Sequence, residues 1–366
     1  MICLGIESTA HTFGVGIIDE KGKILANAKD SYTTKTGGIV PIEAAKHHAE
    51  VKDKVLEEAL KKSGLTLNNI DIIAFSQGPG LLPCLLQGLH FAKELVKKTK
   101  KPLVPVNHCI AHLEIGKLLT KSKDPVLLYA SGANTQIIAY AAGKYRIFGE
   151  TLDQGVGNFI DAFARHTGLG FPGGPKIAEL AKSGSYVELP YSVKGMDVSF
   201  AGLLTNIKQK YDKIKNKENK EEVNGDIDNG NENKSESLKS LTLSSKPSTK
   251  DINQTYNLND LAYSLQETAF AMLIEVSERA MAHLHKKELL LGGGVACNKR
   301  LQEMCAIMCK ERKAESFCPP NEVLTDNAAM IAWLGILMFK AGVKIDPNKA
   351  DIKPYERTDE VNVTWG

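Results

Sequence analysis

The sequence carries the same order of elements twice, and this repetition limits the possible folds more than any other feature. Each half opens with three short strand-like stretches and continues with strands that alternate with amphipathic helices. The first half places its strands within residues 1–19, which form a hairpin, and at 23–28, 70–76 and 103–106, with helices at 41–62, 82–98 and 108–120. The second half places its strands at 126–130, 135–142, 144–149, 288–291 and 314–318, with a long helical stretch from 158 onward and helices at 298–312 and 326–341. The sequence therefore predicts an α/β fold of two similar lobes, residues 1–124 and 125–366, with a central cleft between them.

The length and composition are those of a globular protein with two domains. The chain has 366 residues, of which 43% are hydrophobic and 24% are charged. This mixture is enough for two cores, and it excludes a collagen-like or wholly disordered chain. No stretch approaches 18 uninterrupted apolar residues, and the N-terminal MICLGIESTA lacks the basic region of a signal peptide. Seven scattered cysteines without a CxxC pair are typical of a reducing compartment, so we expect a cytoplasmic protein with no membrane contact.

The charge of the chain is nearly balanced, which bears on nucleic-acid binding. The 46 Lys and Arg residues exceed the 43 Asp and Glu residues by only three. A protein that binds nucleic acid unaided over a large surface is usually more basic. Binding would therefore use a partner protein or a local patch, such as the one formed by Lys97, Lys98, Lys100 and Lys101.

Residues 213–253 differ from the rest of the sequence. These 41 residues contain no aromatic side chain, seven Asn, eight Lys and eight acidic residues. Such a composition buries too little apolar area to offset the entropy lost on ordering. Helix-like sequence resumes on both sides, so we expect a disordered insertion on the surface of the second lobe rather than a linker between domains.

The segment HCIAH holds the first candidate metal ligands. His108 and His112 are four residues apart, so on a helix their imidazoles lie on the same face and can reach one metal ion. The residue after His108 is Cys109, whereas the HExxH metallopeptidases need Glu there as the general base. A peptidase is therefore excluded, and a pair of structural histidines remains an alternative to the metal site.

Asp326, in the segment TDNAAMIAW, is a candidate third ligand. Either Thr325 or Asp326 can cap the helix that begins here, because both residue types accept hydrogen bonds from the first free N–H groups. The carboxylate becomes a metal ligand only if folding brings it to His108 and His112.

Glycine-rich turns indicate nucleotide binding. The stretch LGGGVACN, ending at Asn298, places three glycines between a strand and a helix, where the backbone can approach a nucleotide closely. The turns GIEST at 5–9 and SGANT at 131–135 occupy equivalent places in the two halves and leave backbone N–H groups free for an anion. Two such turns with an adenosine loop resemble the actin, sugar-kinase and Hsp70 superfamily.

Two further segments carry polar candidates. Asp161 lies on a helix that follows the glycine-rich turn at 149–157, and it is either a solvated position or a carboxylate that binds ribose or adenine. The segment KHHAE at 46–50 reads as the polar face of a helix, outside any metal site.

Seven motifs occur in order over almost the whole chain: NHCIAHLEIG, LYASGANTQ, GETLDQGVGN, FPGGP, VKGMDVSFAGLLT, LGGGVACN and TDNAAMIAW. Together they closely resemble the universal tRNA threonylcarbamoyltransferase family, which includes bacterial TsaD and the catalytic subunit of the archaeal and eukaryotic KEOPS complex. The segments VNHCIAHLEIGKL and VKGMD and the ending ERTDEV are similar to the archaeal branch. The resemblance implies transfer of a threonylcarbamoyl group from threonylcarbamoyl-AMP to N6 of adenosine 37 in tRNAs that read ANN codons. It also implies KEOPS-type protein partners, including a kinase subunit.

The resemblance also implies roles for individual residues. His108, His112 and Asp326 match the family's metal-binding and catalytic positions, and Tyr129 matches a fourth position beside the metal. The implied metal is one divalent ion, iron(II) first and zinc as the alternative. The substrate would contact the end of one strand and three glycine-rich segments, at Tyr129, Ala130, Ser131, Gly132, Ala133, Asp161, Gly174 and Asn298.

Some positions depart from the family pattern. Ala178 stands where several archaeal relatives have an acidic residue, and Glu179 follows one place later, where we expect it to face another side of the helix. Ala133 stands where the family often has glycine. Two other functions remain open on the residues alone, a small-molecule kinase of the same superfamily and a non-catalytic nucleotide-binding scaffold. The kinase lacks an obvious catalytic Asp in the first turn, where Glu7 stands.

Overall fold

The structure, a computed structural model, describes residues 1–34, 38–225 and 256–365, and residues 218–225 by their backbone only. It contains two five-stranded mixed sheets with the same topology, in the orders β3-β2-β1-β4-β5 and β12-β11-β6-β7-β8. In each sheet a central strand pairs antiparallel with the strand that follows it and parallel with a later strand. The predicted duplicated α/β lobes are thereby confirmed.

The strands lie close to their predicted positions because apolar runs mark them clearly. The first sheet contains β1 (Ile2–Glu7), β2 (Thr12–Asp19), β3 (Ile24–Ser31), β4 (Ile72–Gly78) and β5 (Leu103–Asn107). The second contains β6 (Val126–Ala130), β7 (Thr135–Ala141), β8 (Lys144–Glu150), β11 (Glu288–Gly292) and β12 (Glu315–Phe317). A two-stranded hairpin, β9 (Val193–Lys194) and β10 (Asp197–Val198), lies outside both sheets.

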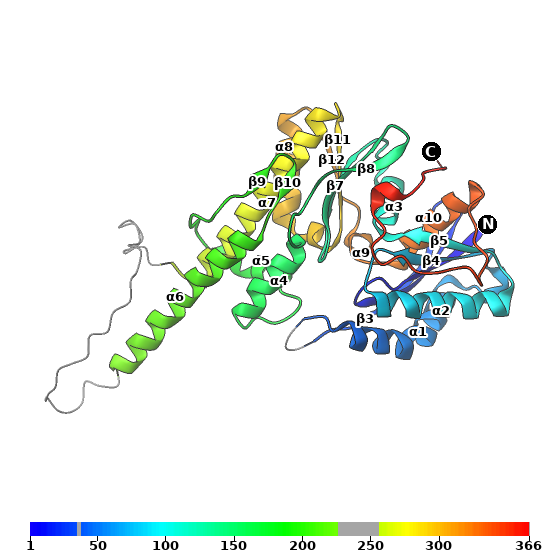
Figure 1. Cartoon of the computed structure of the whole chain (residues 1–366), viewed down its shortest axis with the longest axis horizontal. Coiled ribbons are helices and arrows are strands. Elements are labelled where there is room, and N and C mark those ends of the chain that lie inside the picture. The colour runs from blue at the N-terminus through cyan, green and yellow to red at the C-terminus, as the bar shows by residue number, and fades with distance from the viewer. Residues whose placement is uncertain (35–37, 226–255, 366) are drawn as a thin grey trace, which may run out of the picture.

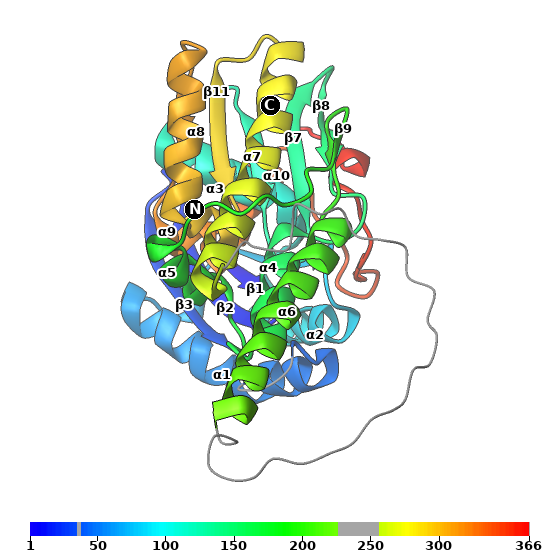
Figure 2. The same ribbon diagram turned by 90° about the vertical axis from the view of Figure 1, so that its left-hand side faces the viewer.

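Helices cover both sheets and fill the space between them. The first half provides α1 (Pro41–Ser63), α2 (Leu82–Thr99) and α3 (His108–Thr120). The second provides α4 (Val156–His166), α5 (Gly174–Leu180), α6 (Ala201–Gly225), α7 (Leu258–His283), α8 (Lys299–Glu311), α9 (Asn321–Leu324) and α10 (Ala328–Lys340). Helices α1 and α2 lie on the outer side of the first sheet (Figure 1), and α7 lies across the second sheet (Figure 2). In the described residues, no helix is both long and apolar enough to cross a lipid bilayer.

Helix α10 crosses from the second half of the chain to the first sheet. It packs against β1, β2 and β4, and also against α3. Two glycines allow this close approach: a Cβ on Gly5 would lie 2.4 Å from Ala332 N, and one on Gly16 would lie 2.3 Å from Ala329 N. Because α10 begins immediately after Asp326, this contact places residue 326 beside α3.

The region after residue 158 differs from the single long helical stretch that we predicted. Helix α4 ends at His166, and Gly168 and Gly170 follow with positive φ angles of 79° and 75°. Two glycines in this left-handed conformation end the helix, since other residues rarely adopt it. Helix α5, the β9–β10 hairpin and α6 then follow as separate elements.

The predicted insertion at 213–253 begins as helix. Helix α6 continues through residue 225, so residues 213–225 have helical backbone. Lysine and glutamate, which have high helix propensity, recur in this part of the sequence. Residues 226–253 lie outside the described residues, and the disorder expected there stays a prediction.

Candidate functional site

Helix α3 brings the two predicted histidines together in the interior. Asn107, at the end of β5, caps the helix: its Oδ1 accepts hydrogen bonds from the backbone N–H groups of Cys109 at 3.0 Å and Ile110 at 3.2 Å. The rings of His108 and His112 are both buried, with centroids 4.8 Å apart. The i, i+4 spacing therefore places two imidazoles side by side, as we predicted from the sequence.

Asp326 joins the two histidines and does not cap α10. The cap is Asn327, whose side chain accepts a hydrogen bond from Met330 N at 3.1 Å, so our expectation of a cap at Thr325 or Asp326 is wrong. Asp326 Oδ1 instead lies 3.4 Å from His108 Nε2 and 3.5 Å from His112 Nε2. The carboxylate thus faces both rings because Asn327 performs the capping.

These three side chains fit a metal ion. One ligand atom from each of His108, His112 and Asp326 lies within 4.8 Å of the others. His112 Nε2 is buried and has no hydrogen-bond partner, although an unpaired buried polar atom is costly. Two imidazole nitrogens and one carboxylate oxygen suit iron(II), zinc and other divalent transition metals. A cation between the three groups would satisfy the unpaired nitrogen.

The electrostatics of the cluster also favour a cation. Burial opposes the charged form of His108, but the carboxylates of Glu7 and Asp326 outweigh it and raise its pKa well above the usual value. Burial also opposes the charged form of Asp326, but the two histidines hold its pKa well below the usual value. Burial and the neighbouring His108 lower the pKa of His112. The charged form of His108 and the neutral form of His112 are therefore favoured.

Glu7 is a functional residue that the sequence analysis did not assign to the metal site. Its side chain is fully buried at the end of β1, and its Oε2 lies 2.9 Å from His108 Nδ1. Its Oε1 accepts hydrogen bonds from Thr9 N at 2.7 Å and from Thr9 Oγ1 at 2.5 Å. A carboxylate at Nδ1 keeps the proton on that nitrogen and leaves Nε2 free as a ligand. The signal in the sequence was an acidic residue at the end of an otherwise apolar strand.

Lys29 is a second residue that sequence reasoning missed. Its Nζ donates hydrogen bonds to Thr325 Oγ1 at 2.7 Å and to the Asp326 carbonyl at 3.2 Å. Burial lowers the pKa of Lys29, although the nearby Asp326 carboxylate partly offsets this. The lysine thus ties β3 to the segment that carries Asp326. Nothing in the local sequence around Lys29 indicates this contact.

Tyr129 lies beside the metal-ligand cluster. It is the last residue but one of β6 and almost fully buried, and its ring centroid is 5.2 Å from that of His112. Burial raises the pKa of its hydroxyl well above the usual value. A bound cation would have to offset this effect for the phenol oxygen to act as a ligand, and the direct ligand role of Tyr129 stays a prediction.

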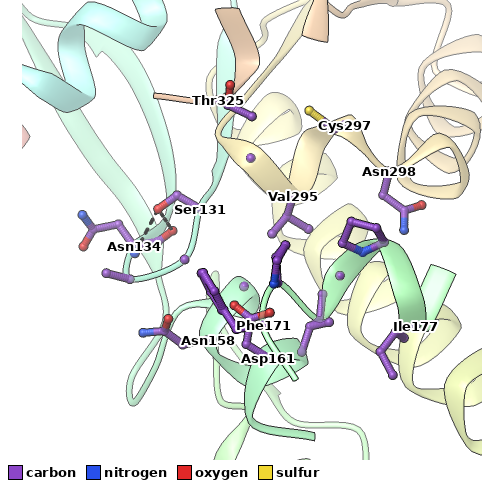
Figure 3. Close-up of a pocket in the computed structure, with 18 of the residues that line it drawn as sticks. Ser131, Asn134, Asn158, Asp161, Phe171, Ile177, Val295, Cys297, Asn298 and Thr325 are labelled. Carbon is purple, nitrogen blue, oxygen red and sulfur yellow. Dashed lines mark hydrogen bonds between the residues drawn. The ribbon is translucent and has the colours of Figure 1, made fainter. Parts of the chain in front are cut away.

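A cavity of about 1560 Å³ lies between the two lobes and opens onto the cluster. His108, Tyr129 and Asp326 line it together with most of the predicted substrate residues: Ser131, Gly132, Ala133, Asp161, Gly174 and Asn298. Figure 3 shows how Ser131, Asp161 and Asn298 approach this space from separate segments of the chain. Ala130 is buried within β6 and does not line the cavity. The fold thus brings together residues from five of the sequence motifs.

The turn at 131–134 is braced by the glycine-rich start of α4. A Cβ on Gly155 would lie 2.3 Å from the Gly132 carbonyl oxygen, and one on Gly157 would lie 2.7 Å from Gly132 Cα. The backbone N–H groups of Gly157 and Asn158 donate to the carbonyls of Ser131 and Gly132 at 3.0 and 2.9 Å. The glycines of GVGN therefore position a small polar turn at the cavity wall.

Asp161 fixes the PGGP loop next to that turn. Its Oδ1 accepts a hydrogen bond from Gly173 N at 2.7 Å, and burial raises its pKa despite this bond. A Cβ on the neighbouring Gly174 would meet no atom within 4 Å, so the backbone there is open to a ligand. Ala178 and Glu179, on the helix that follows, both line the cavity. The carboxylate of Glu179 is exposed and pairs with Lys182 Nζ at 2.5 Å.

Asn298 serves the fold as well as the cavity. Its Oδ1 caps α8 by accepting from Arg300 N at 2.8 Å and Leu301 N at 3.3 Å. Its Nδ2 donates to Gln266 Oε1 at 2.8 Å, which leaves one amide hydrogen for a ligand. The cap therefore orients the amide group toward the cavity.

The segment at 46–50 is not the exposed polar face that we predicted. His48 is fully buried, and its Nε2 donates to the Ala10 carbonyl at 3.0 Å. Burial lowers the pKa of His48 to about 4. Its neighbour His47 lies 3.0 Å from Asp30 Oδ1 and is only partly exposed. The polar face of α1 is thus interrupted by a histidine that packs beneath the first turn of the sheet.

Acid should destabilise the protein through His48. The unfolded chain, with a histidine pKa of about 6.5, binds a proton that the folded state accepts only near pH 4. The stabilisation is therefore complete above about pH 6.5 and lost as the pH falls, by about 2 kcal/mol between pH 6.5 and 5. In His48→Gln, denaturant titrations should show a shallower pH dependence by this amount, whereas the exposed control His90→Gln should follow the wild type. Equal slopes in all three proteins would contradict this prediction.

The sequence comparisons with known proteins all point to threonylcarbamoyl modification of tRNA. Residues 23–333 match the family described as tRNA N6-adenosine threonylcarbamoyltransferase, TsaD. Proteins with that description from Thermococcus sibiricus and Archaeoglobus fulgidus are 49% and 45% identical over 366 residues, which is 100% of both chains in each case. A probable bifunctional tRNA threonylcarbamoyladenosine biosynthesis protein from Methanocaldococcus jannaschii is 46% identical, and the match covers 100% of this chain and 60% of that protein.

Solved structures resemble the fold at low sequence identity. The crystal structure of HypF from T. kodakarensis superposes with a TM-score of 0.53 at 15% identity, over 93% of this chain and 47% of that one. Full-length HypF in its phosphate- and nucleotide-bound form gives a TM-score of 0.55 at 10% identity, over 93% and 56% of the two chains. At these identities the likeness supports the duplicated-lobe architecture alone.

Proposed function

The chain belongs to the tRNA N6-adenosine threonylcarbamoyltransferase family, and from this membership we propose the reaction that its cavity carries out. The protein transfers the threonylcarbamoyl group of threonylcarbamoyl-AMP to N6 of adenosine 37 in tRNAs that read ANN codons. The observation that supports this most is the shared cavity, since the His108–His112–Asp326 cluster opens onto the same space as the glycine-rich turns. The end of the cavity at the metal-ligand cluster suits an activated carbonyl, and the end at the glycine-rich turns suits an adenylate.

The chemistry requires positioning more than a strong nucleophile. N6 of adenosine attacks the carbamoyl carbon and loses a proton, while the bond between that carbon and the phosphate oxygen breaks and AMP leaves. AMP in a mixed anhydride is already a good leaving group, so no covalent enzyme intermediate is needed. A divalent metal bound by His108, His112 and Asp326, most favourably iron(II) with zinc as the alternative, would supply Lewis-acid polarisation of the carbonyl.

Residues around the proposed metal site would hold the reactants in place. Glu7 fixes the orientation of His108, and the turn at 131–134 offers backbone N–H groups toward the phosphate. Asn298 has one free amide hydrogen, and Asp161 holds the loop that opens at Gly174. Tyr129 continues the wall toward the metal cluster, with Ala130 buried behind it in β6. These groups would orient the adenylate and so convert an encounter between two substrates into a single positioned step.

The two alternative functions are less well supported. In the kinase, Glu7 would have to act in phosphoryl transfer, but its carboxylate is already engaged by His108 and Thr9. A pure scaffold would have no need to bring His108, His112 and Asp326 together where the cavity opens. We therefore propose an enzyme in the cytoplasm that works with KEOPS-type partners, including a kinase subunit, because the chain's net charge of +3 gives it little affinity of its own for tRNA.

The deciding experiment supplies the protein, an archaeal partner set, threonylcarbamoyl-AMP and a tRNA that reads ANN codons. We expect N6-threonylcarbamoyladenosine at position 37 and AMP in equal amount, measured by nucleoside mass spectrometry and nucleotide chromatography. A tRNA with guanosine at position 37 is the matched control and should give neither. Phosphorylation of a sugar without any modified tRNA would support the kinase instead.

Binding of the adenylate at Asn298 is best tested with a variant that keeps the cap of α8. Asn298→Asp retains an oxygen to cap α8 but loses both amide hydrogens, the one that faces the cavity and the one bound to Gln266, whose own amide can turn to donate to the new carboxylate. We expect its Kd for an adenylate analogue to rise about tenfold, with the melting temperature nearly unchanged. Asn298→Ala should lose both affinity and stability. Unchanged binding by Asn298→Asp would place the adenylate elsewhere.

A further inference from the structure

The tail after α10 runs back along the first lobe. Gln77 binds it twice, because its Nε2 donates to the Asp351 carbonyl at 2.7 Å and its carbonyl accepts from Lys353 N at 2.8 Å. Gly80 N then donates to the Pro354 carbonyl at 3.1 Å. The tail continues past α3 toward β8 (Figure 1). We call residues 351–365 the strap, and the ERTDEV motif lies within it.

The strap also reaches the second lobe. Arg357 Nη2 lies 3.1 Å from Glu150 Oε1, at the end of β8. Trp365 Nε1 donates to Glu114 Oε1 of α3 at 3.2 Å, and Tyr145 of β8 donates to the same oxygen. The strap therefore connects both lobes to the helix that carries His108 and His112.

Glu356 of the strap contacts the residue that precedes His108. Its side chain is 9% exposed, and its Oε2 accepts a hydrogen bond from Asn107 Nδ2 at 3.1 Å. Its Oε1 lies 2.6 Å from Lys353 Nζ. Asn107 is also buried, and it caps the first turn of α3, directly before His108. One side chain thus links the strap to the start of this helix.

The chemistry of these two groups fixes the direction of the amide. A carboxylate can only accept hydrogen bonds, so the NH2 end of Asn107 must face Glu356. The Oδ1 end then faces the N–H groups of Cys109 and Ile110 and completes the cap. Without Glu356, only the N–H groups of Cys109 and Ile110 hold the amide, and its NH2 group loses its partner. Glu356 therefore anchors the cap from the side opposite to the helix.

We propose that Glu356 is a positioning residue: through Asn107 it fixes the first turn of α3 and so holds His108 in place for the metal. The consequence for the metal rests on the proposed function, whereas the effect on the helix does not. Loss of this anchor should weaken the cap and loosen the first turn of α3 even in metal-free protein. A partner that orients a metal ligand usually changes metal affinity by ten- to a hundredfold.

The test compares Glu356→Ala and Glu356→Gln with the wild type in two measurements. In metal-free full-length protein, hydrogen exchange of the Cys109 and Ile110 amides should be at least about fivefold faster in Glu356→Ala. Titration with cobalt(II), followed by its visible absorption, should give an affinity about tenfold weaker in the same variant. Glu356→Gln keeps an acceptor for Asn107 and should stay within about twofold of wild type in both. The neighbouring Tyr355 is 89% exposed, so Tyr355→Ala is the matched control and should change neither.

The outcomes separate the two proposals. Wild-type exchange at Cys109 and Ile110 in Glu356→Ala would overturn the positioning role. Equal losses in Glu356→Ala and Glu356→Gln would also overturn it, since charge rather than the hydrogen bond would then be responsible. Faster exchange in Glu356→Ala, together with no cobalt binding by the wild type, would support the positioning of α3 and refute the proposed metal site.

Discussion

Replacing His112 with alanine is expected to remove the bound divalent metal and to lower the rate of threonylcarbamoyl transfer by about a hundredfold or more. In the proposed metal site the ring would contribute one of the three ligand atoms, and its Nε2 is buried without a hydrogen-bond partner. Loss of polarisation or of an oxyanion-stabilising group typically costs two to three orders of magnitude in rate. Metal content by mass spectrometry and product formation by nucleoside analysis measure the two effects.

Two further variants separate chemistry from folding. His112→Gln keeps most of the side-chain volume in the buried site and should lose metal and activity while keeping its melting temperature close to that of wild type. His90→Ala, on the exposed face of α2, should keep wild-type metal content and rate. Full activity in a metal-free His112→Gln protein would show that these residues have only a structural role.

Replacing Glu7 with glutamine should weaken metal binding about tenfold, and Glu7→Ala should weaken it about a hundredfold. The carboxylate accepts from both His108 and Thr9, whereas a glutamine has one oxygen for the two donors. Alanine leaves all these buried groups unpaired, which also costs about 1–3 kcal/mol of stability for each. Glu58→Gln, on the exposed side of α1, is the matched control and should bind metal as the wild type does.

Glu7→Gln should also change how the stability of the metal-free protein depends on pH. Glu7 and Asp326 raise the pKa of His108 well above its usual value, so the folded state holds this proton more tightly than the unfolded chain does. That stabilisation is complete below about pH 6.5 and is lost as the pH rises through the raised pKa. Metal must displace the proton, so metal affinity should rise with pH over the same range. In Glu7→Gln both dependences should shift to lower pH, as measured by thermal unfolding and cobalt titration.

The parts of the site that depend on local spacing along the chain could be predicted from the sequence. The i, i+4 pair on α3 and the glycine-rich turns could be placed because helix periodicity and turn composition are local properties. Glu7 and Glu356 could not, since they contact partners 101 and 249 residues away, and only folding shows that their carboxylates are buried. The segment after residue 158 was misread because its apolar residues suit either one long helix or several short elements, and two left-handed glycines decide between them. His48 was misread because charged residues surround it along the chain, whereas in the fold it lies beneath Ala10.

The contact of α10 with the first sheet has a consequence for synthesis of the chain on the ribosome. His108 and His112 are made early, but Asp326 and the helix that carries it to them follow more than 200 residues later. At about 5–20 residues per second, roughly 10–40 s pass before the third ligand emerges. During that interval the face of the first sheet that Gly5 and Gly16 leave flat has no helix to cover it. The nascent first half therefore presents an open apolar surface and an incomplete ligand set, and both are completed by the same late helix.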